Sequence, residues 1–167
     1  MKDQKSYKQP NSRHCFVCGV DNPYGLKLDF YETKPGRVVV DTIVPNHFQG
    51  YPSIVHGGIV ACLVDEALGR AQMGNDVDNP RFMYTAKLSV QYRKPVPTNK
   101  PIRIVGIAIK TKRRLATSRA EIYGPDGELL VDAEATLVNV PEKVIDSVDL
   151  EALGWRIYPD DEATNDH

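Results

Sequence analysis

The clearest pattern of hydrophobic and polar positions spans residues 84–93, where apolar residues occupy every second position. This alternation predicts a β-strand with one apolar and one polar face, and it places Thr85 and Lys87 on the polar face. Three further strands are predicted, at 102–112, 115–123 and 129–140. Because short turns separate these later strands, the sheet that they form should be antiparallel.

The first half of the chain contains two shorter strand patterns and one helix pattern. Strands are predicted at 26–31 and 37–44, followed by an irregular stretch at 45–55. Residues 59–73 are almost continuously apolar and end at a Gly-Asn pair, which predicts a helix buried nearly all round. A single apolar helix needs a sheet wrapped around it, so the predicted fold class is α+β.

The two ends of the chain lack such patterns. We predict an N-terminal arm at 1–25, which is flexible over 1–13 and rich in turns, with a CxxC motif, over 14–25. The main domain should cover 26–140. Residues 141–167 are predicted to be an accessory tail with a short helix at 149–153.

Composition narrows the class of protein. The 167 residues suit one domain, and the net charge of -1 shows none of the basic excess typical of duplex-binding proteins. No apolar run approaches the roughly 20 residues needed to span a bilayer, and we expect no signal peptide. The three cysteines do not suggest a disulfide framework, so we expect a cytoplasmic protein that binds neither nucleic acid nor membrane.

The strongest candidate for chemistry is the string His56-Gly57-Gly58 at the start of the predicted helix. The first amides of a helix have no internal partner and lie at its positive end, so they suit an oxygen that gains negative charge. A thioester carbonyl under attack by water is one such oxygen. Taken alone, His56 is better interpreted as a histidine of the core or one that anchors the loop.

Asp65 lies seven residues beyond Gly58, roughly 10 Å along the helix axis. Its neighbours on the same helix face are small and uncharged, which suits a general base or a nucleophile. The alternative is a structural role, in which the buried Asp65 carboxylate accepts a hydrogen bond from a loop amide. Glu66 can pair with Arg70 four residues on, so we interpret it mainly as structural and keep it as a candidate for substrate binding.

The pair Cys15 and Cys18 resembles half of a zinc knuckle. A structural zinc site needs four ligands, and the remaining cysteine, Cys62, falls inside the predicted helix. We therefore predict two small thiols in a turn, with no metal and no cofactor.

These strings together resemble the PaaI-type branch of the hot-dog acyl-CoA thioesterases. The resemblance covers about residues 14–140 and rests on FQGYP at 48–52, on HGG at 56–58 followed by Asp65, and on HCFVCG and NPYGL upstream. It implies a hot-dog fold, an antiparallel sheet wrapped around one long central helix. It also implies homodimers that join edge to edge, often as dimers of dimers, with active sites at the interface and acyl-CoA as substrate.

The resemblance also assigns roles to residues. Asp65 corresponds to the catalytic base or nucleophile, the Gly57 and Gly58 amides polarise the carbonyl, and His56 shapes the site. Thr85 stands where the family's other subunit offers a Ser or Thr to hold water or substrate. Candidates for contacts with the substrate and the phosphates of coenzyme A are Gln49, Glu66, Lys87, Arg93, Lys94, Arg113 and Arg114.

Two alternatives to hydrolysis remain open from the sequence. Hot-dog dehydratases and hydratases also use a helix N-terminus on a thioester carbonyl, but they pair it with a histidine and an acid that shuttle protons. A non-catalytic acyl-CoA binding module is permitted by the fold alone.

Overall fold

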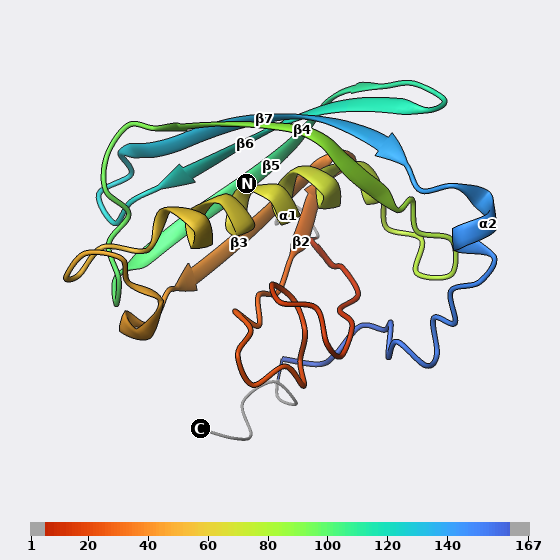
Figure 1. Ribbon diagram of the computed structural model, residues 1–167, viewed down its shortest axis with the longest axis horizontal. Helices are drawn as coiled ribbons and strands as arrows, with labels where there is room; N and C mark the ends of the chain where they lie inside the picture. Colours follow the sequence, from red (N-terminus) through yellow and green to blue (C-terminus); the bar gives the residue numbers. More distant parts are fainter. Residues whose placement is uncertain (1–5, 161–167) are drawn as a thin grey trace.

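One antiparallel sheet curves over a single long helix, α1 (Gly57–Met73), in residues 6–160, which the computed structural model describes (Figure 1). Seven strands lie in the order β1-β2-β3-β5-β6-β7-β4. They are β1 (Tyr7–Lys8), β2 (Tyr31–Lys34), β3 (Arg37–Ile43), β4 (Met83–Tyr92), β5 (Pro101–Thr111), β6 (Leu115–Tyr123) and β7 (Leu129–Asn139). A 3-10 turn, η1 (Asn46–Phe48), precedes α1, and a short helix, α2 (Glu142–Ile145), follows the sheet.

Helix α1 is buried as the sequence predicts, since no residue from 59 to 73 is exposed. Leu63 and Leu68 are fully buried in one cluster with apolar side chains of the sheet. The sheet approaches closely at Gly106, where a Cβ atom would stand 2.3 Å from the Ala67 carbonyl oxygen. The α+β prediction is therefore confirmed. No helix in the described part of the chain has the length and apolar character that a bilayer crossing requires.

Most predicted strands agree with the structure to within one or two residues at their ends, but the first does not. Strand β2 begins only at Tyr31, at the end of the predicted strand 26–31. The Leu26 and Leu28 amides instead donate to the Phe16 and Val17 carbonyls of the N-terminal turn. The apolar alternation there arises because Leu28 and Phe30 are buried in the core without belonging to a strand of the sheet.

A β-bulge in β4 reverses the predicted facing of Thr85. Between Thr85 and Lys87 the chain advances two residues on β4 while its partner β7 advances one, from Leu137 to Thr136. The extra residue, Ala86, shifts the alternation, so Thr85 shares the helix-facing side with Leu88 beyond the bulge. The prediction that Thr85 lies on the same polar face as Lys87 is wrong for this reason, although Thr85 remains exposed.

The two ends of the described chain pack against the domain and against each other. Gln9 and Asn11 are buried, and Asn11 bridges to Arg156 of the tail, which differs from the predicted flexible arm. In the tail, Trp155 packs edge-on against Phe82. The predicted helix at 149–153 does not form; that stretch is a series of turns. The predictions for residues 1–5 and 161–167 lie outside the described residues.

Candidate active site

The start of α1 is held in place by the loop before it. The His56 amide donates to the Phe48 carbonyl at 2.9 Å, and the His56 Nδ1 atom accepts from the Gly58 amide at 2.9 Å. His56 is thus the N-cap of the helix, and the Gly58 amide already has an acceptor. The Gly57 amide is left as the first helix amide with no acceptor among residues 6–160.

A cavity of about 470 Å³ lies against this helix start. The Tyr92 hydroxyl closes one side by donating to the Gly57 carbonyl at 2.9 Å. On another side, Gly50 touches His56 so closely that a Cβ atom there would stand 3.2 Å from the His56 Cα. The remaining lining is largely aromatic and apolar, from Tyr51, Ile54, Val55, Val60, Pro95 and Val96, with Arg93 and Lys94 beside it.

Asp65 lies farther along the same helix and has a close partner on the sheet. The Thr85 hydroxyl donates to Asp65 Oδ1 at 2.7 Å, a contact that depends on the bulge in β4. Asp65 is half-buried and lines a second cavity of about 220 Å³ together with Thr85, Met73 and Phe82. This places a carboxylate and a hydroxyl side by side within one chain.

The carboxylate and the free helix amide do not line the same cavity. Asp65 follows Gly57 by eight residues, which corresponds to roughly 12 Å along the helix axis. The cavity at Gly57 and the cavity at Asp65 share no lining residue. A single chain therefore presents two half-sites, one with the amide and one with the carboxylate.

Glu66, next to Asp65, makes the predicted ion pair. Arg70 Nε lies 2.9 Å from Glu66 Oε1, and only 1% of the Arg70 side chain is exposed. Burial disfavours the charged guanidinium, but Glu66 and the Cys18 sulfur outweigh it and raise the pKa of Arg70 above its ordinary value. Arg70 also donates to the Pro10 carbonyl at 2.7 Å, so this pair fastens the N-terminal segment to α1.

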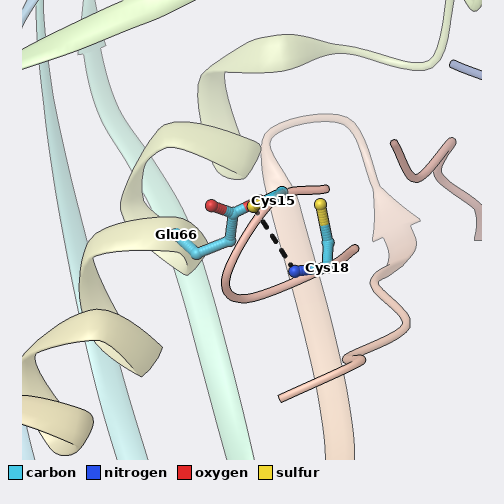
Figure 2. Close-up of side chains that lie close together, drawn as sticks. All are labelled: Cys15, Cys18 and Glu66. Carbon is cyan, nitrogen blue, oxygen red and sulfur yellow. Dashed lines mark hydrogen bonds between the residues drawn. The ribbon is translucent and has the colours of Figure 1, made fainter. Parts of the chain in front are cut away.

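The fold brings Glu66 to Cys15 and Cys18, which the sequence does not reveal. One ligand atom from each of the three lies within 4.8 Å of the others. Figure 2 shows Glu66 of the helix beside the turn that carries the two cysteines. A hydrogen bond from the Cys18 thiol, aided by backbone amides and opposed by burial, lowers the pKa of Cys15 to about 6. In contrast, burial and then the nearby Asp65 charge raise the pKa of Cys62. Of the three thiols, Cys15 is therefore the one that most readily carries charge.

The residues predicted to contact coenzyme A are dispersed. Arg93 is paired with Asp132, although it lines the Gly57 cavity together with Lys94. Gln49 accepts from the Ser53 amide at 3.2 Å and so braces its own loop. Lys87 is exposed on β4, and Arg113 and Arg114 lie exposed in the β5–β6 turn, lining neither cavity.

Comparison with known proteins shows a similarity to thioesterases. The thioesterase superfamily profile matches residues 53–131. The acyl-coenzyme A thioesterase THEM4 of Rattus norvegicus is 32% identical over 94 residues, which is 56% of this chain and 39% of that protein. The chain therefore spans well under half the length of this curated relative.

Solved structures share the fold. Protein RHA08564, a thioesterase superfamily protein, is 30% identical with a TM-score of 0.68, over 75% of this chain and 63% of that one. Protein smu.793 from Streptococcus mutans UA159, bound to acetyl CoA, has a TM-score of 0.60 at 19% identity, over 68% and 88% of the two chains. With one helix wrapped by an antiparallel sheet, the chain has the hot-dog fold of these thioesterases, and over residues 53–131 it is similar to the thioesterase superfamily.

Proposed function

We propose that this protein is an acyl-CoA thioesterase that hydrolyses an acyl- or aryl-CoA to the free acid and coenzyme A. The observation that carries the proposal is the hydrogen bond from Thr85 to Asp65, set in a cavity beside the helix whose first amide, that of Gly57, has no acceptor among the described residues. The family match and the curated relative support thioester chemistry. The acetyl-CoA complex of smu.793 supports an acyl-CoA as the substrate.

The chemistry follows from these groups. Asp65 takes a proton from a water molecule that lies beside it and the Thr85 hydroxyl, and the water oxygen attacks the thioester carbonyl. The carbonyl oxygen becomes an oxyanion that accepts from the Gly57 amide at the positive end of α1. The tetrahedral intermediate collapses with cleavage of the carbon–sulfur bond, and coenzyme A leaves as a thiolate. Direct attack by Asp65, through an anhydride that water then hydrolyses, uses the same groups.

A second copy of the chain can join the two half-sites. Strand β4 lies at the edge of the sheet, and its outer side has no strand partner in residues 6–160. It runs opposite to α1, because Thr85 contacts Asp65 whereas Tyr92, near the other end of β4, contacts Gly57. Pairing of β4 with its own copy about a two-fold axis places the Thr85 end of one strand beside the Tyr92 end of the other.

In such a homodimer, the Asp65 carboxylate of one subunit faces the Gly57 amide of the second copy. We therefore propose that the active form is a homodimer or a dimer of dimers. Sedimentation equilibrium of the purified protein should give a dimer or tetramer. A monomer that retains full hydrolysis would contradict this arrangement.

The hydratase alternative is disfavoured by the state of His56. Its Nδ1 atom accepts from the Gly58 amide, so the proton of a neutral His56 lies on Nε2. Such a ring is positioned to donate, and it would have to release the helix cap to shuttle protons through both nitrogens. Formation of an enoyl-CoA from a 3-hydroxyacyl-CoA, without release of thiol, would nevertheless restore this alternative.

The test is release of free thiol from a panel of acyl-CoAs by the wild type and by Asp65→Asn. Loss of an essential base should lower kcat on the order of a hundredfold or more. Asp126→Asn, an exposed carboxylate in the β6–β7 turn, is the matched control and should leave the rate unchanged. Equal rates for wild type and Asp65→Asn would overturn the role of Asp65. If no acyl-CoA releases thiol, the proposal that the protein is a thioesterase is wrong.

A further inference from the structure

We propose that Cys15, Cys18 and Glu66 form a binding site for a zinc ion between the N-terminal turn and helix α1. Their ligand atoms lie within 4.8 Å of one another, and Figure 2 shows the Glu66 carboxylate beside the Cys15 sulfur. Donor atoms around a tetrahedral zinc ion stand roughly 3.6–3.8 Å apart, given Zn–S and Zn–O bonds of about 2.3 and 2.1 Å. Small side-chain rotations therefore suffice to close the site.

The turn that carries the cysteines is built to present sulfur. Cys15 Sγ accepts from the Val17 and Cys18 amides at 3.4 and 3.5 Å, which favours the thiolate that a metal binds. The turn closes through the Gly19 amide, which donates to the Cys15 carbonyl at 2.9 Å. A Cβ atom at residue 19 would stand only 2.2 Å from that carbonyl oxygen, so the turn requires glycine there.

Arg70 completes the surroundings of the site. Its Nε atom holds Glu66 Oε1, while the other carboxylate oxygen has no hydrogen bond among the described residues. Its Nη2 atom is buried and has no partner within residues 6–160, although the Cys18 sulfur lies close enough to stabilise the guanidinium charge. A metal-bound Cys18 thiolate would supply the missing acceptor. Arg70 would then orient a zinc ligand, as outer-shell partners of metal ligands do.

The charges of the completed site balance. Two thiolates and one carboxylate carry three negative charges, and a divalent ion together with the Arg70 guanidinium carries three positive charges. Without an ion, charged Cys15 and Glu66 repel each other, a repulsion that opposes loss of the Cys15 proton. Two sulfur ligands favour zinc over magnesium or calcium, which prefer oxygen.

The site differs from a closed four-cysteine knuckle. Three protein ligands leave one coordination position, and all three residues line the cavity of about 220 Å³ that also contains Asp65. A water molecule from this cavity would fill that position. The zinc ion would link residues far apart in the sequence and fasten the N-terminal turn onto α1.

The test is titration of cobalt(II), and then zinc, into the full chain after removal of metal under a phosphine reductant. Cobalt bound by two thiolates should give sulfur-to-cobalt charge-transfer absorption in the near ultraviolet, and one equivalent of zinc should abolish it. Cys15→Ser and Cys18→Ser should weaken zinc binding at least a hundredfold, beyond the 10–100-fold typical of outer-shell losses. The matched control, Cys62→Ser, should bind as the wild type does.

X-ray absorption at the zinc edge of the wild type keeps the test independent of how the variants fold. It should show two sulfur ligands and two lighter ones. The proposal is overturned if the wild type takes up no metal under reducing conditions, if its bound zinc has no sulfur ligand, or if Cys62→Ser alone abolishes binding.

Discussion

Helix α1 has two flanks of opposite character. Towards the sheet it packs mainly apolar side chains, with Leu63 and Leu68 in one cluster with Ile104 and Ile122. Towards the N-terminal segment it presents Glu66 and Arg70, which meet thiols, backbone carbonyls and the ring of Phe30. The first flank supplies most of the hydrophobic stabilisation. The second places the buried ion pair of Glu66 and Arg70 beside a cavity, so hydrophobic packing and buried charge lie on different sides of one helix.

The largest expected effect lies on the sheet flank. Leu68→Ala should lower the free energy of unfolding by about 4 kcal/mol, because it opens a cavity where the side chain is fully buried. Leu153→Ala, at a side chain that is 43% exposed, is the control and should change it by less than about 0.5 kcal/mol. Urea titration measures both. Equal losses would show that burial of Leu68 against the sheet does not determine the loss of stability.

The next effect lies on the polar flank. Arg70→Met should destabilise the fold by about 3 kcal/mol, because it leaves Glu66 half-buried without its cation. The double variant Arg70→Met/Glu66→Leu should recover part of that loss, since both charges are then gone. Thermal unfolding of the three proteins checks this. A double variant less stable than Arg70→Met would show that the pair acts through something other than its buried charge.

A smaller effect, on the rate alone, is expected at the bulge. Thr85→Val removes the donor to Asp65 with little change in shape, so kcat should fall about tenfold while the unfolding midpoint stays nearly constant. Thr85→Ser keeps the hydroxyl and should restore most of the rate. Steady-state thiol release distinguishes these variants, and a Thr85→Val enzyme as fast as the wild type would remove Thr85 from the site.

The smallest effect is one of reactivity. In the metal-free, reduced protein, Cys15 should react with iodoacetamide at half its maximal rate near pH 6, because the reactive thiolate forms as the pH rises through its pKa. Cys62, whose pKa is raised, should react only at a pH above its ordinary value near 9. Peptide mass mapping across pH separates the two. Identical profiles would contradict the assignment of the charged thiol to Cys15.

What the sequence predicts well is what neighbouring residues determine. The apolar run of α1 and the alternation in the later strands predict their elements to within one or two residues. The string HGG likewise indicates where the helix starts, and the count of residues from it places Asp65 within the helix. Both signals are local, because helix and strand periods appear in consecutive residues.

What the sequence does not predict depends on long-range packing. Glu66 joins Cys15 and Cys18 only because the N-terminal segment folds back onto α1. The burial of Gln9 follows from the same docking, since its side-chain amide donates to the Arg70 and Gly74 carbonyls. No periodicity in either segment records these contacts. The pairing between β4 and β7 that creates the bulge is likewise visible only in the sheet.

The extra residue at Ala86 allows Thr85 and Leu88, which are three positions apart, to face the same side of β4. Before the bulge the odd-numbered residues of β4 face the helix, and after it the even-numbered residues do. Removal of one residue between Thr85 and Leu88 would place these two residues two positions apart, so both would face the helix on a regularly paired strand without the bulge. In this strand, a one-residue gap in an alignment of relatives would therefore signal the loss of the bulge and not a reversal of the facing of Thr85.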